Sequence, residues 1–270
     1  MKKIKRALKE FLPDSVIGKA GSTWDSLKRA NEIPGAYFHP WRRDSIDNLK
    51  RIKNIHVGER CFIIGNGPSL RKTDLSKLKD EYTIGMNRIY MLFDEIGFNT
   101  SYYLSVNDLV IEQCAEDIKD IHCPKFLSWR SKKWVSPLPD LSFLYTTYTE
   151  PKFAFNAWKR LWEGATVTYV AMQLAFHLGF DDVFLIGVDH SFTTKGKPNS
   201  TITSHGNDPN HFDSKYFGKG FRWQLPDLET SERAYVMARE SYKKHGRNIY
   251  DATIGGKLTV FPKVLYKDLF

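Results

Sequence analysis

Short apolar runs alternate with helical or loop segments along most of the chain. Runs rich in β-branched and aromatic residues predict buried strands at 61–64, 82–86, 102–106, 125–128, 183–186 and 248–251. Apolar residues at helical spacing predict helices over 44–56, 110–118, 166–178 and 229–244. Strands that alternate with helices are typical of a parallel sheet covered on both faces. We therefore predict an α/β fold of the Rossmann-like type, with a doubly wound, mostly parallel sheet.

Two internal segments lack such a pattern. Residues 131–159 are rich in Pro, Trp and Tyr, and we expect an irregular excursion beside the active face. Residues 192–228 combine charged, Gly, Asn and His residues without core periodicity. A long irregular segment in a compact domain is more often a functional lid than a linker, so we place a lid at about 190–228.

The first 55 residues are expected to form a basic N-terminal arm with helices, followed by the α/β domain at 56–270. Residues 1–13 are basic and amphipathic. They would suit an anionic membrane surface, and packing on the protein itself or on a partner subunit fits equally well. Residues 18–43 carry Gly, Pro and several aromatics, which predicts an extended wrapping arm that could also serve a homo-oligomer.

Composition limits the class of protein. The chain has 270 residues, of which 41% are hydrophobic, and a net charge of +9, which favours acidic partners such as nucleotides, phosphorylated glycans or anionic lipid. The three cysteines lack metal-type spacing and fit a reducing cytosol. No apolar run approaches the roughly 20 residues that span a bilayer, and no signal-peptide core is present. We expect a cytoplasmic protein that could lie at the inner membrane face.

Candidate chemistry begins at the turn Gly65-Asn66-Gly67-Pro68-Ser69, directly after the first strand. Two glycines let a ligand approach the backbone closely, and an open α/β sheet binds nucleotides at such strand ends. The spacing is neither that of the dinucleotide fingerprint nor that of a P-loop. A tight strand-to-helix turn, capped by Ser69 or Thr73, is the alternative interpretation.

Three successive strands end in asparagine, at Asn66, Asn87 and Asn107. Short amides at this edge could read ribose hydroxyls, phosphate or a base, although asparagine is also simply a good turn residue. Further candidates at the same edge are the helix start with Thr166 and Thr168, the strand end at Asp189, and the cation of Lys257 in a second glycine turn.

The segments 63–70, 85–90, 166–189 and 210–212 together resemble two related groups of proteins. One group is the bacterial sialyltransferases that modify surface lipooligosaccharide. The other comprises proteins similar to archaeal 6-hydroxymethylpterin diphosphokinase, including flagellin-modifying members. The resemblance covers roughly residues 58–262. It implies a variant of the GT-A glycosyltransferase fold.

The resemblance also implies roles for individual residues. A histidine in the lid, His211, would be the general base. The lid tyrosines of the sialyltransferases have no secure match in this sequence; Phe192 and Tyr216 stand nearest to the expected positions. Asp189, Arg88 and Lys257 match the wider group better, with Asp189 as a second catalytic candidate. The nucleotide-binding set would be Gly65, Asn66, Gly67, Pro68, Ser69, Asn87, Arg88, Asn107, Thr166, Thr168 and Lys257.

The reaction that these features predict is metal-independent glycosyl transfer without a cofactor. The donor would be a nucleotide-activated sugar, with a CMP-sugar favoured, and the acceptor a bacterial surface glycan or glycolipid. No Asp-x-Asp pair follows any predicted strand. A nucleoside monophosphate leaving group can be stabilised by N–H groups, hydroxyls and a cation. His211 would take the proton of the acceptor hydroxyl.

Three alternatives stay open from the residues alone. A Mg²⁺- and ATP-dependent pyrophosphokinase acting on a pterin-like alcohol would use Asp108 and Asp189 near the phosphates. Metal binding would draw on His205, Asp208, His211 and Asp213, although their spacing matches no strong ligand motif. Nucleic-acid binding is suggested by charge only; because the basic residues are scattered, we expect no nucleic-acid partner.

Overall fold

The computed structural model describes residues 30–270. The basic segment 1–13 and the first part of the expected wrapping arm lie outside the described residues, as does any membrane contact made by them. Within 30–270, no helix is both long enough and apolar enough to cross a bilayer.

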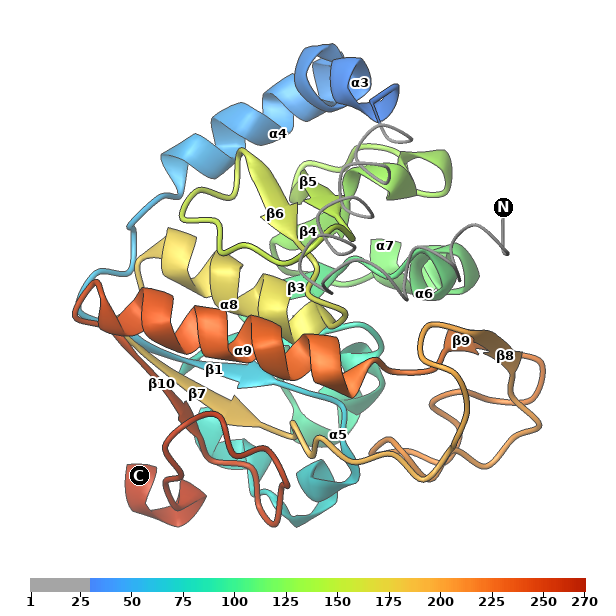
Figure 1. The fold of residues 1–270 in the computed structure, drawn as a ribbon, viewed down its shortest axis with the longest axis vertical. Coiled ribbons are helices and arrows are strands. Elements are labelled where there is room, and N and C mark those ends of the chain that lie inside the picture. Colours follow the sequence, from blue (N-terminus) through green and yellow to red (C-terminus); the bar gives the residue numbers. More distant parts are fainter. Residues whose placement is uncertain (1–29) are drawn as a thin grey trace, which may run out of the picture.

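Within the described residues, eight strands form one sheet in which every neighbouring pair is parallel. The spatial order is β10-β7-β1-β2-β3-β4-β5-β6 (Figure 1). The chain therefore runs outward from β1 to β6 and then returns to the other side of β1. The strands are β1 (Arg60–Ile64), β2 (Tyr82–Met86), β3 (Tyr102–Ser105), β4 (Lys125–Ser128), β5 (Leu141–Thr147), β6 (Arg160–Trp162), β7 (Asp182–Ile186) and β10 (Asn248–Asp251).

Both faces of this sheet are buried, as a doubly wound fold requires. In β1, Cys61 and Ile63 face one core, while Phe62 and Ile64 face the other. Helices α8 (Val167–Leu178) and α9 (Leu228–Lys243) cover the first face, side by side in Figure 1. The second face is covered by short elements: η1 (Pro68–Lys72), η2 (Leu75–Leu78), η3 (Ile89–Leu92), α5 (Phe93–Ile96), α6 (Asp108–Gln113), α7 (Ala115–Lys119), η4 (Trp129–Lys133) and the C-terminal η5 (Tyr266–Leu269).

Helix α8 has the ends that its sequence predicts. The Thr166 side chain caps its start, accepting a hydrogen bond from the Thr168 amide. Gly179 ends it in the left-handed conformation, with φ of 106°. Eleven of its twelve residues are buried, so this helix is the centre of the first core.

The structure corrects three of the expected elements. Residues 32–43 are not extended, because α3 (Glu32–Phe38) and α4 (Pro40–Arg51) occupy them, and α4 is capped by His39 rather than by Asp44 or Ser45. The helix expected over 110–118 is broken at Cys114 into α6 and α7. Within the expected excursion at 131–159 lies β5, a fully buried strand of the sheet.

Helix α4 also bears on the predicted division at residue 55. Leu49 joins the core beneath α8, and the Ser45 hydroxyl accepts a hydrogen bond from the backbone amide of Phe143 in β5. The division stays a prediction, but the packing places α4 in the same core as the sheet.

The segment 190–228 follows strand β7 and leads into helix α9. It carries a small antiparallel pair, β8 (Thr201–Thr203) and β9 (Arg222–Gln224). Figure 1 shows this pair beyond the N-terminal end of α9, at the edge where the sheet strands end. We call residues 190–228 the lid.

A buried histidine in α8 gives the fold a predictable response to acid. Burial lowers the pKa of His177 to about 4, and its Nε2 lies 2.8 Å from the Leu49 carbonyl oxygen. The unfolded chain binds this proton near pH 6.5 and the folded chain does not, so stability is full above pH 6.5 and falls as the pH drops towards 4. The wild type should lose about 3 kcal/mol of unfolding free energy through His177 as the pH falls through this range. We expect His177→Gln to lack this part of the loss. Urea unfolding of both proteins at pH 7, 5.5 and 4.5 measures this, and parallel pH curves would contradict it.

Candidate active site

A cavity of about 250 Å³ opens at the carboxyl ends of the central strands. Residues that follow β1, β2, β3 and β7 line its floor, and the start of α8 and the lid form its walls. It lies beside the boundary between β1 and β7, where the strand order reverses. Ligands of open α/β sheets bind at this switch point. Of the predicted residues, those that line the cavity are Gly65, Asn66, Gly67, Asn87, Asn107, Thr166, Thr168, Asp189 and His211.

The glycines after β1 are required by the neighbouring strand end. A Cβ on Gly65 would stand 2.3 Å from the Gly187 carbonyl oxygen, and one on Gly67 would stand 1.8 Å from a carboxylate oxygen of Asp189. That carboxylate accepts a hydrogen bond from the Ser69 hydroxyl at 2.7 Å and another from the Ser69 amide. Asp189 and Ser69 thus hold the two turns together. Asp189 lines the cavity, whereas Pro68 and Ser69 do not, and the catalytic role of Asp189 stays a prediction.

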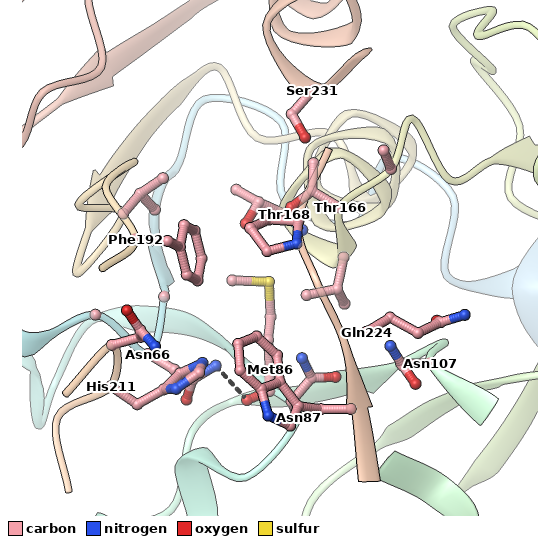
Figure 2. A pocket seen from close by; sticks show the side chains of 18 of the residues that line it. Asn66, Met86, Asn87, Asn107, Thr166, Thr168, Phe192, His211, Gln224 and Ser231 are labelled. Atoms are coloured by element: carbon pink, nitrogen blue, oxygen red, sulfur yellow. Dashed lines mark hydrogen bonds between the residues drawn. The ribbon is translucent and has the colours of Figure 1, made fainter. Parts of the chain in front are cut away.

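The three strand-end asparagines lie in different local settings. Asn66 donates from Nδ2 to the Met86 carbonyl, and its buried Oδ1 has no partner among the described residues. Asn87 has a φ of 51°, in the left-handed region that asparagine tolerates better than most residues, and its Oδ1 accepts from the Ser105 hydroxyl. Asn107 caps α6 through its Oδ1, as the turn interpretation predicts. All three border the cavity (Figure 2), and their role as nucleotide ligands stays a prediction.

The start of α8 forms the opposite wall. Figure 2 shows Thr166 and Thr168 beside Ser231 of α9, away from His211 and Asn87. The Thr166 hydroxyl is 3.4 Å from the hydroxyl of Tyr235, which also lines the cavity. A twelve-residue helix directs its partial positive charge and free N–H groups from this end, so the wall suits an anion.

The lid brings His211 to the cavity as one half of a pair. Its Nδ1 lies 2.6 Å from the Asp208 carboxylate, and its ring stacks on Tyr216 with centroids 4.0 Å apart. Asp208 is buried and also accepts a hydrogen bond from the Asn210 amide. An Nδ1–H held in this way leaves Nε2 as the acceptor, which is the tautomer that a general base needs.

The possible metal cluster is not assembled. Within residues 30–270, no group of three or more His, Cys, Asp or Glu side chains lies close enough to hold a metal ion. Asp213, one of the four candidates, instead pairs with Arg71.

A buried acidic residue at the cavity was not found from the sequence. Glu163 accepts hydrogen bonds from Arg130 at 2.8 Å and from the Thr146 hydroxyl at 2.6 Å. Burial raises the pKa of Glu163, while the Arg130 guanidinium acts in the opposite direction. Arg130 also pairs with Asp108, so the carboxylate considered for Mg²⁺ shares this guanidinium with Glu163.

A second cavity residue that the sequence analysis missed is His190. Its Nε2 lies 2.8 Å from the Glu232 carboxylate of α9, and its side chain is only 7% exposed. It directly follows Asp189 at the end of β7, so its place at a strand end was the available signal.

Besides Pro68 and Ser69, two more predicted nucleotide ligands, Arg88 and Lys257, do not line the cavity. Arg88 donates to the backbone carbonyls of Lys215 and Tyr216, and so anchors the lid. Lys257 is exposed, and only its backbone amide reaches the crevice edge, where it donates to the Asp189 carbonyl. Among the described residues, the cavity lining therefore holds no lysine or arginine.

Fold and cavity together define a doubly wound α/β protein with a cavity at its topological switch point. A sequence profile of the family described as "6-hydroxymethylpterin diphosphokinase MptE-like" matches residues 38–195, more than half of the chain. The chain belongs to this family.

A solved structure with a similar fold is titled "Structure of MAf glycosyltransferase from Magnetospirillum magneticum AMB-1". The TM-score is 0.51 at 14% sequence identity, and the similarity covers 90% of this chain. The chain spans 41% of the length of that structure. A search of curated protein sequences finds no match.

The contacts of Arg88 predict what happens when they are lost. We expect Arg88→Ala to loosen the lid and to speed trypsin cleavage after Lys215 and Lys219 roughly tenfold, because hydrogen bonds from a charged donor are removed. Mass spectrometry of the fragments over time measures the rates, with the exposed Arg51→Ala as the matched control. Equal cleavage rates in the two variants would show that Arg88 does not hold the lid.

Proposed function

We propose that the protein is a glycosyltransferase that uses a nucleotide-activated sugar, with a CMP-sugar favoured. The observation that carries this proposal is the His211–Asp208 pair, held by the lid over a cavity at the switch point of the sheet. The fold shared with a MAf glycosyltransferase and the resemblance to sialyltransferases support the same class.

The reaction follows from the two walls of the cavity. His211 Nε2 would take the proton of the acceptor hydroxyl while that oxygen attacks the anomeric carbon of the sugar. Asp208 would keep the ring in the required tautomer and stabilise the imidazolium that forms. The start of α8, with Thr166 and Thr168, would stabilise the phosphate of the leaving nucleotide.

Charge in the cavity favours a nucleoside monophosphate over ATP. Among the described residues no lysine or arginine lines the cavity, and the carboxylate of Asp189 lines it without a cationic partner. A monophosphate carries less negative charge than a triphosphate, so helix N–H groups and hydroxyls can suffice for it. The acceptor, on the sialyltransferase resemblance, would be a bacterial surface glycan or glycolipid.

The family description favours a second candidate, a Mg²⁺- and ATP-dependent pyrophosphokinase acting on a pterin-like alcohol. Its magnesium would need carboxylates near the phosphates. Asp189 already accepts hydrogen bonds from Ser69, and Asp108 pairs with Arg130, so a metal would have to share either carboxylate with these partners.

Nucleotide binding separates the two candidates. We expect calorimetric titration with CMP, CDP, UDP, GDP and ATP, each with and without Mg²⁺, to show binding of CMP or CDP that does not depend on the metal. Binding of ATP that requires Mg²⁺ would instead support the pyrophosphokinase. Failure of every nucleotide to bind would overturn both.

The base is tested by turnover of the donor. We expect His211→Ala to lower the hydrolysis of a panel of CMP-activated sugars roughly 10²–10⁴-fold, with CMP affinity retained. Asp208→Asn should also lower turnover, because it leaves His211 free to adopt the wrong tautomer. The exposed lid residue His205 provides the control, and His205→Ala should keep the wild-type rate. Unchanged turnover in His211→Ala would remove His211 from the mechanism.

A further inference from the structure

The cavity holds a second histidine pair, on the wall opposite His211, that the proposed reaction leaves unused. His190 follows β7, and its Nε2 is fixed by the Glu232 carboxylate at 2.8 Å. Its backbone has a φ of 52°, in the left-handed region that residues with a β-carbon adopt uncommonly. Strained backbone of this kind persists where the surroundings determine it, and it is concentrated at functional sites.

The neighbours of this pair place it on the wall that the start of α8 forms. The His190 ring lies 6.0 Å from the ring of Tyr235, whose hydroxyl is 3.4 Å from that of Thr166 at the start of α8. His190, Tyr235 and Thr166 all line the same cavity. The titratable groups that face His190 are Glu232 and Tyr235 of α9, while the carboxylate of neighbouring Asp189 is bound to Ser69.

The proposed reaction calls for a cation near the departing phosphate on this wall. A departing nucleoside monophosphate gains negative charge, which is best stabilised by a cation fixed in advance. No described lysine or arginine lines the cavity, and the side chain of Lys257 does not reach it. An imidazolium can meet the requirement, because it carries two N–H donors and Glu232 accepts from only one of them.

We propose that His190, oriented by Glu232, contacts the donor phosphate and stabilises the leaving nucleotide as an imidazolium. This rests on the proposed glycosyltransferase function. In the transfer step the acceptor oxygen bonds to the anomeric carbon, and its proton passes to His211. The bond from that carbon to the phosphate oxygen breaks, its electron pair stays on the phosphate, and the His190 N–H donates a hydrogen bond to that oxygen.

The assignment is tested by comparing two ligands that differ only in the phosphate. Titration calorimetry measures the affinity for CMP and for cytidine in the wild type, His190→Asn, Glu232→Gln and the control His205→Gln. Asparagine is chosen because it tolerates a positive φ. We expect His190→Asn to weaken CMP binding about tenfold or more and to leave cytidine binding unchanged, because only CMP carries the phosphate.

Glu232→Gln removes the orienting carboxylate and should give a smaller loss of the same kind, while His205→Gln should match the wild type. Retained preference for CMP over cytidine in both His190→Asn and Glu232→Gln overturns the assignment and leaves the proposed function standing. An equal loss for CMP and cytidine overturns it as well, because it shows a general effect on the cavity. A wild type that binds no CMP overturns the assignment to a CMP donor, and a wild type that binds none of the nucleotides tested above overturns the proposed function as well.

Discussion

The close contact between the turns that follow β1 and β7 is the constraint on which the cavity depends. The amides of Gly65 and Gly67 donate to the carbonyls of Ile186 and Gly187, each at 2.8 Å. This spacing leaves no room for a β-carbon on either glycine. Asp189 adds two hydrogen bonds to Ser69 across the same boundary. Two strand ends that are distant in sequence thereby become one rigid floor at the switch point.

The lid takes its position from this floor. The backbone amide of Phe212 donates to the Asn66 carbonyl at 2.9 Å, directly beside the floor glycines. Arg88, which follows β2, holds the lid carbonyls next to Tyr216, and the Tyr216 ring supports His211 by stacking. The proposed base is therefore placed by backbone contacts that begin at the sheet. A shift of the floor would move His211 as well.

The local parts of this structure could be predicted from the sequence, and the contacts between distant segments could not. Strands β2 and β4 have the predicted bounds, and Thr166 and Gly179 end α8 as expected, because burial and capping act over a few residues. The buried strand β5 was missed among Pro and aromatic residues whose composition is typical of loops. The cavity-lining asparagines, Thr166 and His211 were found as strand-end, helix-start and lid residues. The Ser69–Asp189 and His190–Glu232 pairs join segments whose meeting no local pattern encodes.

The net charge of the chain and the charge of the cavity lining differ, and the two can act on nucleotides in different ways. The chain carries a net charge of +9, yet no described lysine or arginine lines the cavity. A positive surface raises the local concentration of anionic ligands of every kind, because such fields act over long distances. Under the proposed function, selection then falls to the cavity, where helix N–H groups and hydroxyls would stabilise the charge of a monophosphate better than that of a polyphosphate. Under the proposed function, the same protein can attract many nucleotides and still retain those whose charge its cavity can match.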